Sequence, residues 1–381
     1  MACGRITAPL PSREYIAASQ PPISSPAGAD RPSWGPEAVT AVSYNPRMTG
    51  SPEPVAAQRG ARPRVPDFFI VGHAECGTTA LYEALRRHPQ IFMSGVKEPQ
   101  FFASRQRTGE GVVSRFEETG RDVLSFHEYL SLYAAARPEQ RIGDASTFYL
   151  WSERAPARIA QAQPGAKIIA IFRDPASFLR SLHLQMVQNG AESEHDLRKA
   201  LALEGERRHG RRIPRGSHWP AALMYSERVR YTEQLQRFHN VFPREQILVL
   251  IYDDFLADND GTIRRVLRFL DVEENAPPEV GRVNSSVDVR SPVLRRALHA
   301  IVAGNGAPER ATRGAIRSLS SRRLRAEVLY PLRRRVVFRA PEPPDEALMD
   351  ELRSRYRSEV VALGDHLGRD LVTLWGYDHV V

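Results

Sequence analysis

The chain has 381 residues, of which 42% are hydrophobic, and a formal net charge of +8. This length allows one large α/β domain or two smaller ones, and no apolar run is long enough to span a bilayer. The positive charge favours anionic partners, but no nucleic-acid-binding module is recognisable, so we expect no nucleic-acid partner. With two cysteines, Cys3 and Cys76, and no signal-peptide pattern, we expect no structural disulfide and a cytoplasmic location.

The chain divides by composition into an extension and a domain. Residues 1–63 are rich in Pro, Ala, Ser and Gly and lack periodicity, which predicts a disordered N-terminal extension before a domain at 64–381. Continuous apolar runs alternate with helical patterns in this domain, at residues 68–71, 167–172 and 246–251. Such runs are typical of strands buried on both faces. We therefore expect an α/β fold, a P-loop-like open parallel sheet with helices on both faces.

The last part of the domain holds two further segments. Residues 304–344 are rich in arginine and end in a Pro-rich stretch, so we interpret them as a basic insert. A solvated face is one interpretation of the insert, and a binding surface for an anionic acceptor or a membrane is the other. Residues 345–376 show helical periodicity and are predicted to form a C-terminal helix.

A strand, a glycine-bounded loop and a helix start follow one another in residues 68–81. Gly72 and Gly77 have the glycine spacing of a P-loop, but Thr78 and Thr79 stand where a P-loop has Lys and Ser or Thr. Loop amides and a helix N-terminus form a phosphate cradle. The missing lysine argues against a P-loop kinase, which would depend on ATP and magnesium.

A second anion site is predicted where the apolar run 167–172 ends. Arg173 follows this run directly, and Ser181 lies eight residues beyond Arg173, inside the following helix. The guanidinium fork and the hydroxyl can converge on one phosphate. Two separate phosphate sites imply a nucleotide that carries phosphates at two ends.

These motifs resemble the PAPS-dependent sulfotransferases, especially the branch of the heparan sulfate sulfotransferases and their bacterial relatives. The resemblance covers about residues 65–300 and 345–376, and its pieces occur in the family's order: Pro66–Leu81, Lys97–Phe102, Arg173–Ser181 and Leu363–Leu371, closed by Trp375. It implies the sulfotransferase fold and a bacterial-type enzyme. The implied reaction is in-line transfer of a sulfuryl group from 3′-phosphoadenosine-5′-phosphosulfate (PAPS), without a metal, to a hydroxyl or amine. The acceptor would be a carbohydrate, a glycolipid or a small metabolite.

The resemblance also implies roles for particular residues. Glu98 corresponds to the family's general base, and Lys97 would lie near the donor or acceptor anions. The implied 5′-phosphosulfate loop comprises Glu75, Cys76, Gly77, Thr78, Thr79 and Ala80. The implied 3′-phosphate site comprises Arg173 and Ser181, and Arg290 would close over the nucleotide. Asp144, Ser146 and Tyr149 would lie on the acceptor side.

The chain departs from the family at Glu75, where the family usually has a lysine that reaches the 5′-phosphate. A carboxylate there would disfavour an anionic ligand. Lys97 or a nearby arginine could supply the charge, or Glu75 could point away from the ligand. The alternative is a catalytically weakened protein of this fold that binds an anionic glycan or nucleotide.

Overall fold

The computed structural model describes residues 64–104, 124–214, 217, 220–274, 288–289, 338–339 and 342–380. All of these residues lie in one compact unit, Val39–Val381. The predicted extension 1–63, most of the basic segment 304–344 and Arg290 lie outside the described residues, so the interpretations given for them stay predictions.

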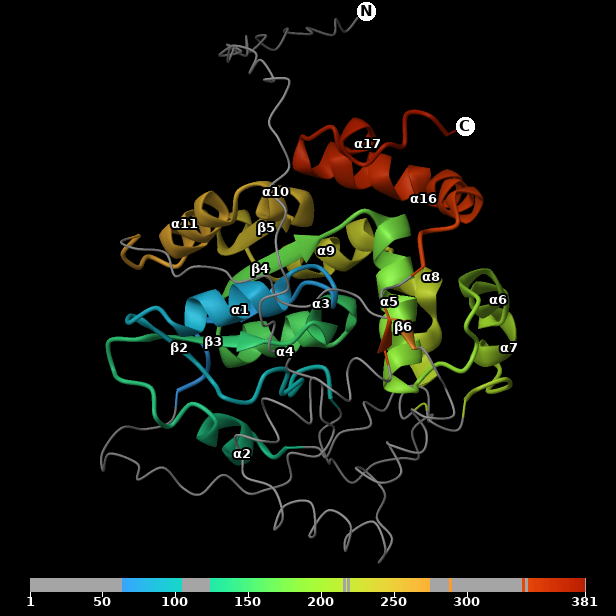
Figure 1. The fold of residues 1–381 in the computed structure, drawn as a ribbon. Helices are drawn as coiled ribbons and strands as arrows, with labels where there is room; N and C mark the ends of the chain where they lie inside the picture. Colours follow the sequence, from blue (N-terminus) through green and yellow to red (C-terminus); the bar gives the residue numbers. More distant parts are fainter. Residues whose placement is uncertain are drawn as a thin grey trace, which may run out of the picture. The chain divides into compact units, whose positions relative to one another are not determined.

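Five parallel strands form the central sheet in the order β2-β3-β1-β4-β5 (Figure 1). The strands are β1 (Phe68–Ile70), β2 (Ile91–Met93), β3 (Arg141–Ala145), β4 (Lys167–Phe172) and β5 (Ile247–Ile251). The chain leaves β1 for β2 and β3 on one side and then crosses to β4 and β5 on the other. Ligands of open α/β sheets bind at such a reversal of strand order, beyond the carboxyl ends of the strands.

The three predicted apolar runs are confirmed as β1, β4 and β5, and the prediction of an open parallel α/β sheet is confirmed with them. The apolar pattern did not predict β2 and β3. β2 has only three residues, and β3 carries Arg141, Gly143 and Asp144 within its five residues. A Cβ atom at Gly143 would lie 2.2 Å from the Phe68 ring, so the close packing of β1 requires glycine there.

Helices lie on both sides of the sheet (Figure 1). The described helices are α1 (Thr78–Arg86), α2 (Phe126–Ser131), α3 (Phe148–Trp151), α4 (Ala155–Ala162), α5 (Pro175–Asn189), α6 (Leu197–Ala202), α7 (Glu204–Arg208), α8 (Tyr225–Arg228), α9 (Tyr231–His239), α10 (Tyr252–Ala257), α11 (Asn259–Phe269), α16 (Glu346–Leu367) and α17 (Leu371–Leu374), with 3₁₀ turns at Pro220–Leu223 and Arg244–Gln246. A two-stranded antiparallel ribbon joins β6 (Asp288–Val289) and β7 (Phe338–Arg339).

The end of the chain is attached to the helix that follows β4. Asp174 caps α5 by accepting hydrogen bonds from the backbone N–H groups of Ala176 and Ser177, at 3.2 and 2.9 Å. The same carboxylate accepts a 2.7 Å hydrogen bond from the Tyr377 hydroxyl. Helix α16 packs against both α5 and α9. The C-terminal segment therefore fixes the start of α5 and, with it, the segment directly after β4.

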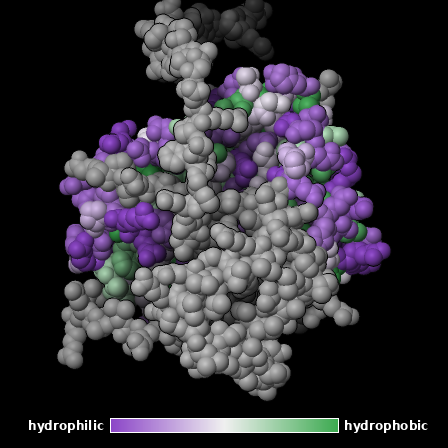
Figure 2. Space-filling view, in the orientation of Figure 1, coloured by the Kyte–Doolittle hydropathy of each residue, from purple (hydrophilic) through white to green (hydrophobic). Residues whose placement is uncertain are grey.

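The core consists of the buried faces of the sheet and its helices, with β1 and nearly all of β4 fully buried. Polar side chains cover most of the described surface that faces the viewer in Figure 2. Phe126 and Leu256 are among the large hydrophobic side chains that are exposed in the described part of the chain. Among the described residues, no helix combines the length and the apolar character that crossing a membrane requires.

Candidate active site

The loop after β1 is built around two glycines. A Cβ atom at Gly72 would lie 2.6 Å from the backbone nitrogen of Ile171, so glycine alone lets this loop approach β4. Gly77 has a φ of +85°, a left-handed conformation that favours glycine, and α1 begins at the next residue, Thr78. The first amides of a helix have no partner within the helix, so they are available to an anion seated in this loop.

Arg173 connects the end of β4 to this loop. Its Nη1 donates a 2.9 Å hydrogen bond to the backbone carbonyl of Glu75, and its guanidinium carbon lies 4.8 Å from the centre of the Tyr252 ring. The guanidinium is thus held beside the loop by a hydrogen bond and a cation–π contact. Ser181 lies in α5, and its side chain is buried. The structure therefore brings Arg173 to the predicted phosphate loop.

Glu75 has a defined partner in the structure. Its Oε1 accepts a 2.7 Å hydrogen bond from Nε2 of Gln185 in α5, and its φ is +60°. Burial raises the pKa of the Glu75 carboxyl, while the charges of Arg173 and Lys97 oppose the rise. A raised pKa favours the neutral carboxyl, which repels an anion less than a carboxylate does.

The other loop residues differ in their exposure. The Cys76 thiol is fully buried, and burial raises its pKa to about 12, so it is a neutral packing group rather than a nucleophile. Thr78 is buried at the start of α1, whereas Thr79 and Ala80 are half-buried beside it. The loop therefore offers an anion mainly its backbone amides.

The Glu98 carboxylate lies in a short, constrained segment between β2 and α2. Lys97 Nζ is 2.9 Å from its Oε1, while Thr147 Oγ1 and Gln100 Nε2 donate to its Oε2 at 3.1 and 3.3 Å. Its backbone N–H donates to the carbonyl of Ala145 at the end of β3, at 3.0 Å. Glu98 and Gln100 have φ of +59° and +56°. Such sparsely populated backbone conformations concentrate at functional sites.

Asp144 forms a buried polar cluster at the end of β3. Its carboxylate accepts hydrogen bonds from the hydroxyls of Tyr129 and Tyr149, both at 2.8 Å, and of Ser146, at 2.7 Å. The Ser146 oxygen in turn accepts from the backbone N–H of Gln100 at 3.1 Å. Burial raises the pKa of Asp144 to about 6, and the three hydroxyl donors oppose the rise. The cluster supports the backbone of the Glu98 segment.

The predicted acceptor-side residues Asp144, Ser146 and Tyr149 thus bond chiefly to one another and to that segment. Their contact with an acceptor stays a prediction, as does that of Arg290. The pattern of the sequence did not single out Gln185, the partner of Glu75. It also missed His73 and Arg228, two buried polar residues near the loop. Periodicity gives no sign of such residues, since their partners lie far away in the sequence.

Two surface hollows of the described residues lie at the other end of the sheet. Asp67, Arg141 and Asp271 line one, and Lys167 borders the next, at the amino ends of the strands. Lys167 and Arg141 pair with Asp271 at 2.5 and 3.5 Å, so their charges are used within the fold. We place the candidate site at the loop instead. In the described part of the chain, no three His, Cys, Asp or Glu side chains are grouped as metal ligands.

Comparison with known proteins agrees with this geometry. The model of the Sulfotransferase family matches residues 66–276. Carbohydrate sulfotransferase 15 of Mus musculus is 29% identical over 251 aligned positions, and the match covers 55% of this chain and 44% of that protein. Heparan sulfate glucosamine 3-O-sulfotransferase 3B1 of Mus musculus is 25% identical over 271 residues, 70% of this chain and 61% of that protein. The chain spans about half the length of the curated relatives it matches.

The fold is similar to that of a solved sulfotransferase structure. The sulfotransferase from Alicyclobacillus acidocaldarius is 29% identical, with a TM-score of 0.50, and the match covers 68% of this chain and 96% of that one. The family model spans the loop after β1, the Glu98 segment and Arg173 together. The chain has the sulfotransferase fold and belongs to the sulfotransferase family.

Proposed function

We propose that this protein transfers a sulfuryl group from PAPS to a hydroxyl group of a carbohydrate acceptor. Membership of the sulfotransferase family supports sulfuryl transfer. The names of the carbohydrate and heparan sulfate relatives support a carbohydrate acceptor. The other acceptors that we consider are an amine group, a glycolipid and a small metabolite.

The nucleotide would bind across the carboxyl ends of β1 and β4. The 5′ end would lie on the loop 72–79 and the amides of α1, because unpaired amides at a helix start favour phosphate oxygens. The 3′-phosphate would bind Arg173, with Ser181 contributing its hydroxyl. The hydrogen bond from Arg173 to the loop carbonyl supports this arrangement, since it keeps the guanidinium beside the cradle.

Glu98 is the proposed general base. Its carboxylate would take the proton of the acceptor hydroxyl while the new oxygen–sulfur bond forms and the bond from sulfur to the 5′-phosphate oxygen breaks. The observation that carries this proposal is the fixed position of the carboxylate, held by Lys97, Gln100 and Thr147. The Lys97 ammonium, 2.9 Å from the Glu98 carboxylate, would also neutralise charge that develops on the transferred group.

The Asp144 cluster would act as a positioning element rather than a reacting group. Its hydroxyls and carboxylate bond to one another and to the backbone at Gln100, two residues from Glu98. A fixed backbone restricts where the Glu98 carboxylate can point, and precise placement contributes strongly to catalysis.

The replacement Glu98→Gln tests the base. The amide keeps the shape and cannot take the proton, so turnover of [³⁵S]PAPS with a glycan panel should fall by about 10²- to 10⁴-fold. Calorimetric titration should show an almost unchanged affinity for PAP, the desulfated nucleotide. Glu139→Gln, at the exposed other end of the sheet, is the matched control. Unchanged turnover in Glu98→Gln would remove Glu98 as the base.

The second candidate function is a catalytically weakened protein that binds an anionic glycan or nucleotide. Glu75 favours it, because a half-buried carboxyl stands in the proposed 5′ site. Titration of the natural protein and of Glu75→Lys with PAP separates the two functions. Micromolar binding by the natural protein, about −8 kcal/mol, supports the sulfotransferase. Binding by the lysine variant alone would indicate a lost donor site, and no binding by either would favour a glycan binder.

A further inference from the structure

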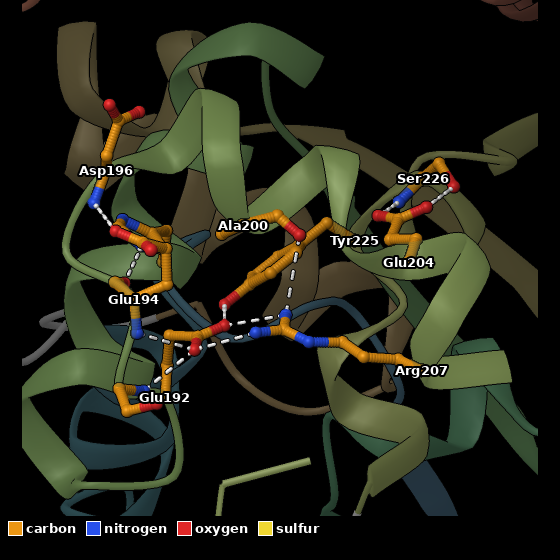
Figure 3. A network of polar contacts seen from close by, with 10 residues as sticks. Glu192, Glu194, Asp196, Ala200, Glu204, Arg207, Tyr225 and Ser226 are labelled. Atoms are coloured by element: carbon orange, nitrogen blue, oxygen red, sulfur yellow. Dashed lines mark hydrogen bonds and ion pairs between the residues drawn. The ribbon is translucent and has the colours of Figure 1, made fainter. Parts of the chain in front are cut away.

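Two arginines of the described chain are fully buried, and their surroundings differ. Arg207 and Arg228 are each 1% exposed. The terminal nitrogens of Arg207 bind the Glu192 carboxylate at 2.7 and 2.8 Å, and the Tyr225 hydroxyl and two backbone N–H groups complete that network (Figure 3). Within the described residues, none of the three guanidinium nitrogens of Arg228 has a hydrogen-bond partner.

A buried, unpaired guanidinium is costly for the fold. Its five N–H groups have lost water, and a lone buried charge loses far more solvation than a neutral polar group does. The rings of Phe148 and Trp151, 4.9 and 5.2 Å from the guanidinium carbon, recover only part of this loss through cation–π attraction. Among the described residues, nothing accepts a hydrogen bond from the Arg228 guanidinium, which points to a ligand that does.

Arg228 lies where the proposed reaction occurs. Its ring partners belong to α3, which starts just after Thr147, the residue whose hydroxyl binds Glu98. The backbone N–H of Leu150 in α3 donates to the carbonyl of Val71, at the start of the phosphate loop, at 3.1 Å. Burial lowers the pKa of His73 in the loop, and the charge of Arg228 adds to this fall. Burial also lowers the pKa of Arg228, and the charge of Glu98 opposes that fall.

Further unsatisfied groups accompany Arg228. His73 donates one 2.8 Å hydrogen bond from Nε2 to the side-chain oxygen of Gln234, whose amide nitrogen donates to the backbone carbonyl of Arg228 at 3.3 Å. The Nδ1 atom of His73 and the hydroxyl of Tyr231, whose ring centres lie 5.4 Å apart, have no partner among the described residues. Three elements, the loop, α8 and α9, thus contribute unpaired buried polar atoms to one region.

Among the described residues, two other cations lie beside the loop, and each has contacts of its own; we assign the remaining donors of Arg173 to the 3′-phosphate. Lys97 pairs with Glu98, and Arg173 donates to the loop carbonyl and stacks on Tyr252. An anion of the size of a phosphosulfate needs a cation with free donors, and a planar guanidinium fork fits its oxygens. Glu75 supplies no such charge.

We propose that Arg228 binds the 5′-phosphosulfate end of the donor and is the main cation for that end of the site. The proposal rests on the proposed function. It gives Arg228 the role of the positive charge that is missing at position 75, where this chain has a glutamate. The energy that the fold loses by burying the unpaired guanidinium is recovered when the donor's oxygens accept its hydrogen bonds.

The test compares Arg228→Met and Arg228→Lys with the natural protein. Each is titrated by calorimetry with PAP, which carries the 5′-phosphate, and with adenosine 3′-monophosphate, which lacks it. Arg228→Met should weaken the binding of PAP by about 10- to 100-fold and change the affinity for adenosine 3′-monophosphate by no more than about twofold. Arg228→Lys, which keeps the charge, should fall between the natural protein and the methionine variant.

A second measurement separates binding from a structural role. Removal of an unpaired buried charge should leave the Tm of the ligand-free protein unchanged or raise it. Arg207→Met is the matched control: it strands the buried Glu192 carboxylate and should lower the Tm, while PAP affinity of the folded fraction stays natural. A large fall in Tm for Arg228→Met would assign Arg228 to the fold and overturn the proposal.

The remaining outcomes are equally decisive. Natural PAP affinity in Arg228→Met, equal losses for both nucleotides, or the same PAP loss in Arg207→Met would each overturn the role of Arg228 and leave the proposed function standing. Failure of the natural protein to bind PAP at all would overturn the proposed function and this proposal together.

Discussion

Replacement of Asp144 by asparagine should make the protein's stability depend less on pH. Asp144 is 1% exposed and accepts hydrogen bonds from three hydroxyls. In Asp144→Asn, the amide oxygen can still accept from Tyr129 and Tyr149. The amide N–H groups then face Ser146, whose oxygen can accept a hydrogen bond if its own proton turns away. The variant therefore resembles the protonated acid in charge and shape.

The size of the effect follows from the pKa of the buried carboxyl. Burial raises the pKa of Asp144 from 3.8 to about 6. At 1.36 kcal/mol per pH unit, ionisation of the folded protein costs it about 3 kcal/mol relative to the unfolded chain. The stabilising contribution of the protonated group is complete below about pH 4, declines as the pH rises from about 4 to 6, and is absent above that range. Asp144→Asn does not lose this contribution.

The assay is the Tm of both proteins measured from pH 4 to 8 at constant ionic strength. The other titrating groups cancel in the difference, so the variant should gain about 3 kcal/mol on the natural protein between pH 4 and 7, about 6–12 °C in Tm. A difference that is constant over this range would refute a raised pKa. A variant that loses stability relative to the natural protein as the pH rises would show that hydrogen bonding outweighs burial and that the pKa is lowered.

Two further replacements test the nucleotide site and the loop. Arg173→Ala should weaken the binding of PAP by about 10- to 100-fold and the binding of AMP far less, because only PAP carries the 3′-phosphate that we assign to the guanidinium. Equal losses of affinity for both nucleotides in calorimetry would contradict the two-phosphate assignment. Gly72→Ala should lower the free energy of unfolding by about 1–3 kcal/mol and impair PAP binding, because the new Cβ would lie 2.6 Å from backbone on β4. Gly205→Ala, with no atom within 4 Å of the new Cβ, is its control and should leave the Tm unchanged or higher.

The predictions of the three apolar strands and of the glycine-bounded loop between β1 and α1 were confirmed, because their physical cause is local. A run such as 167–172 is apolar at almost every position because both faces of β4 are covered, and that requirement is visible in the sequence. The glycines of the loop after β1 are visible for a similar reason, since only glycine tolerates the backbone approach at Gly72 and the positive φ at Gly77. The order of these motifs along the chain was sufficient to suggest the family, which the comparisons then established.

Contacts between distant segments were decided only by the tertiary structure. The sequence presents Glu75 as an unfavourable charge, but its hydrogen bond to Gln185 crosses 110 positions, and its raised pKa comes from burial. Arg207 and Arg228 are the same type of residue, and the sequence does not distinguish them. The fold alone pairs Arg207 with the Glu192 carboxylate and leaves the Arg228 guanidinium without a hydrogen-bond partner among the described residues. Local sequence determines backbone conformation and which faces are buried. The pairing of a buried polar group depends on which remote segment the fold brings against it.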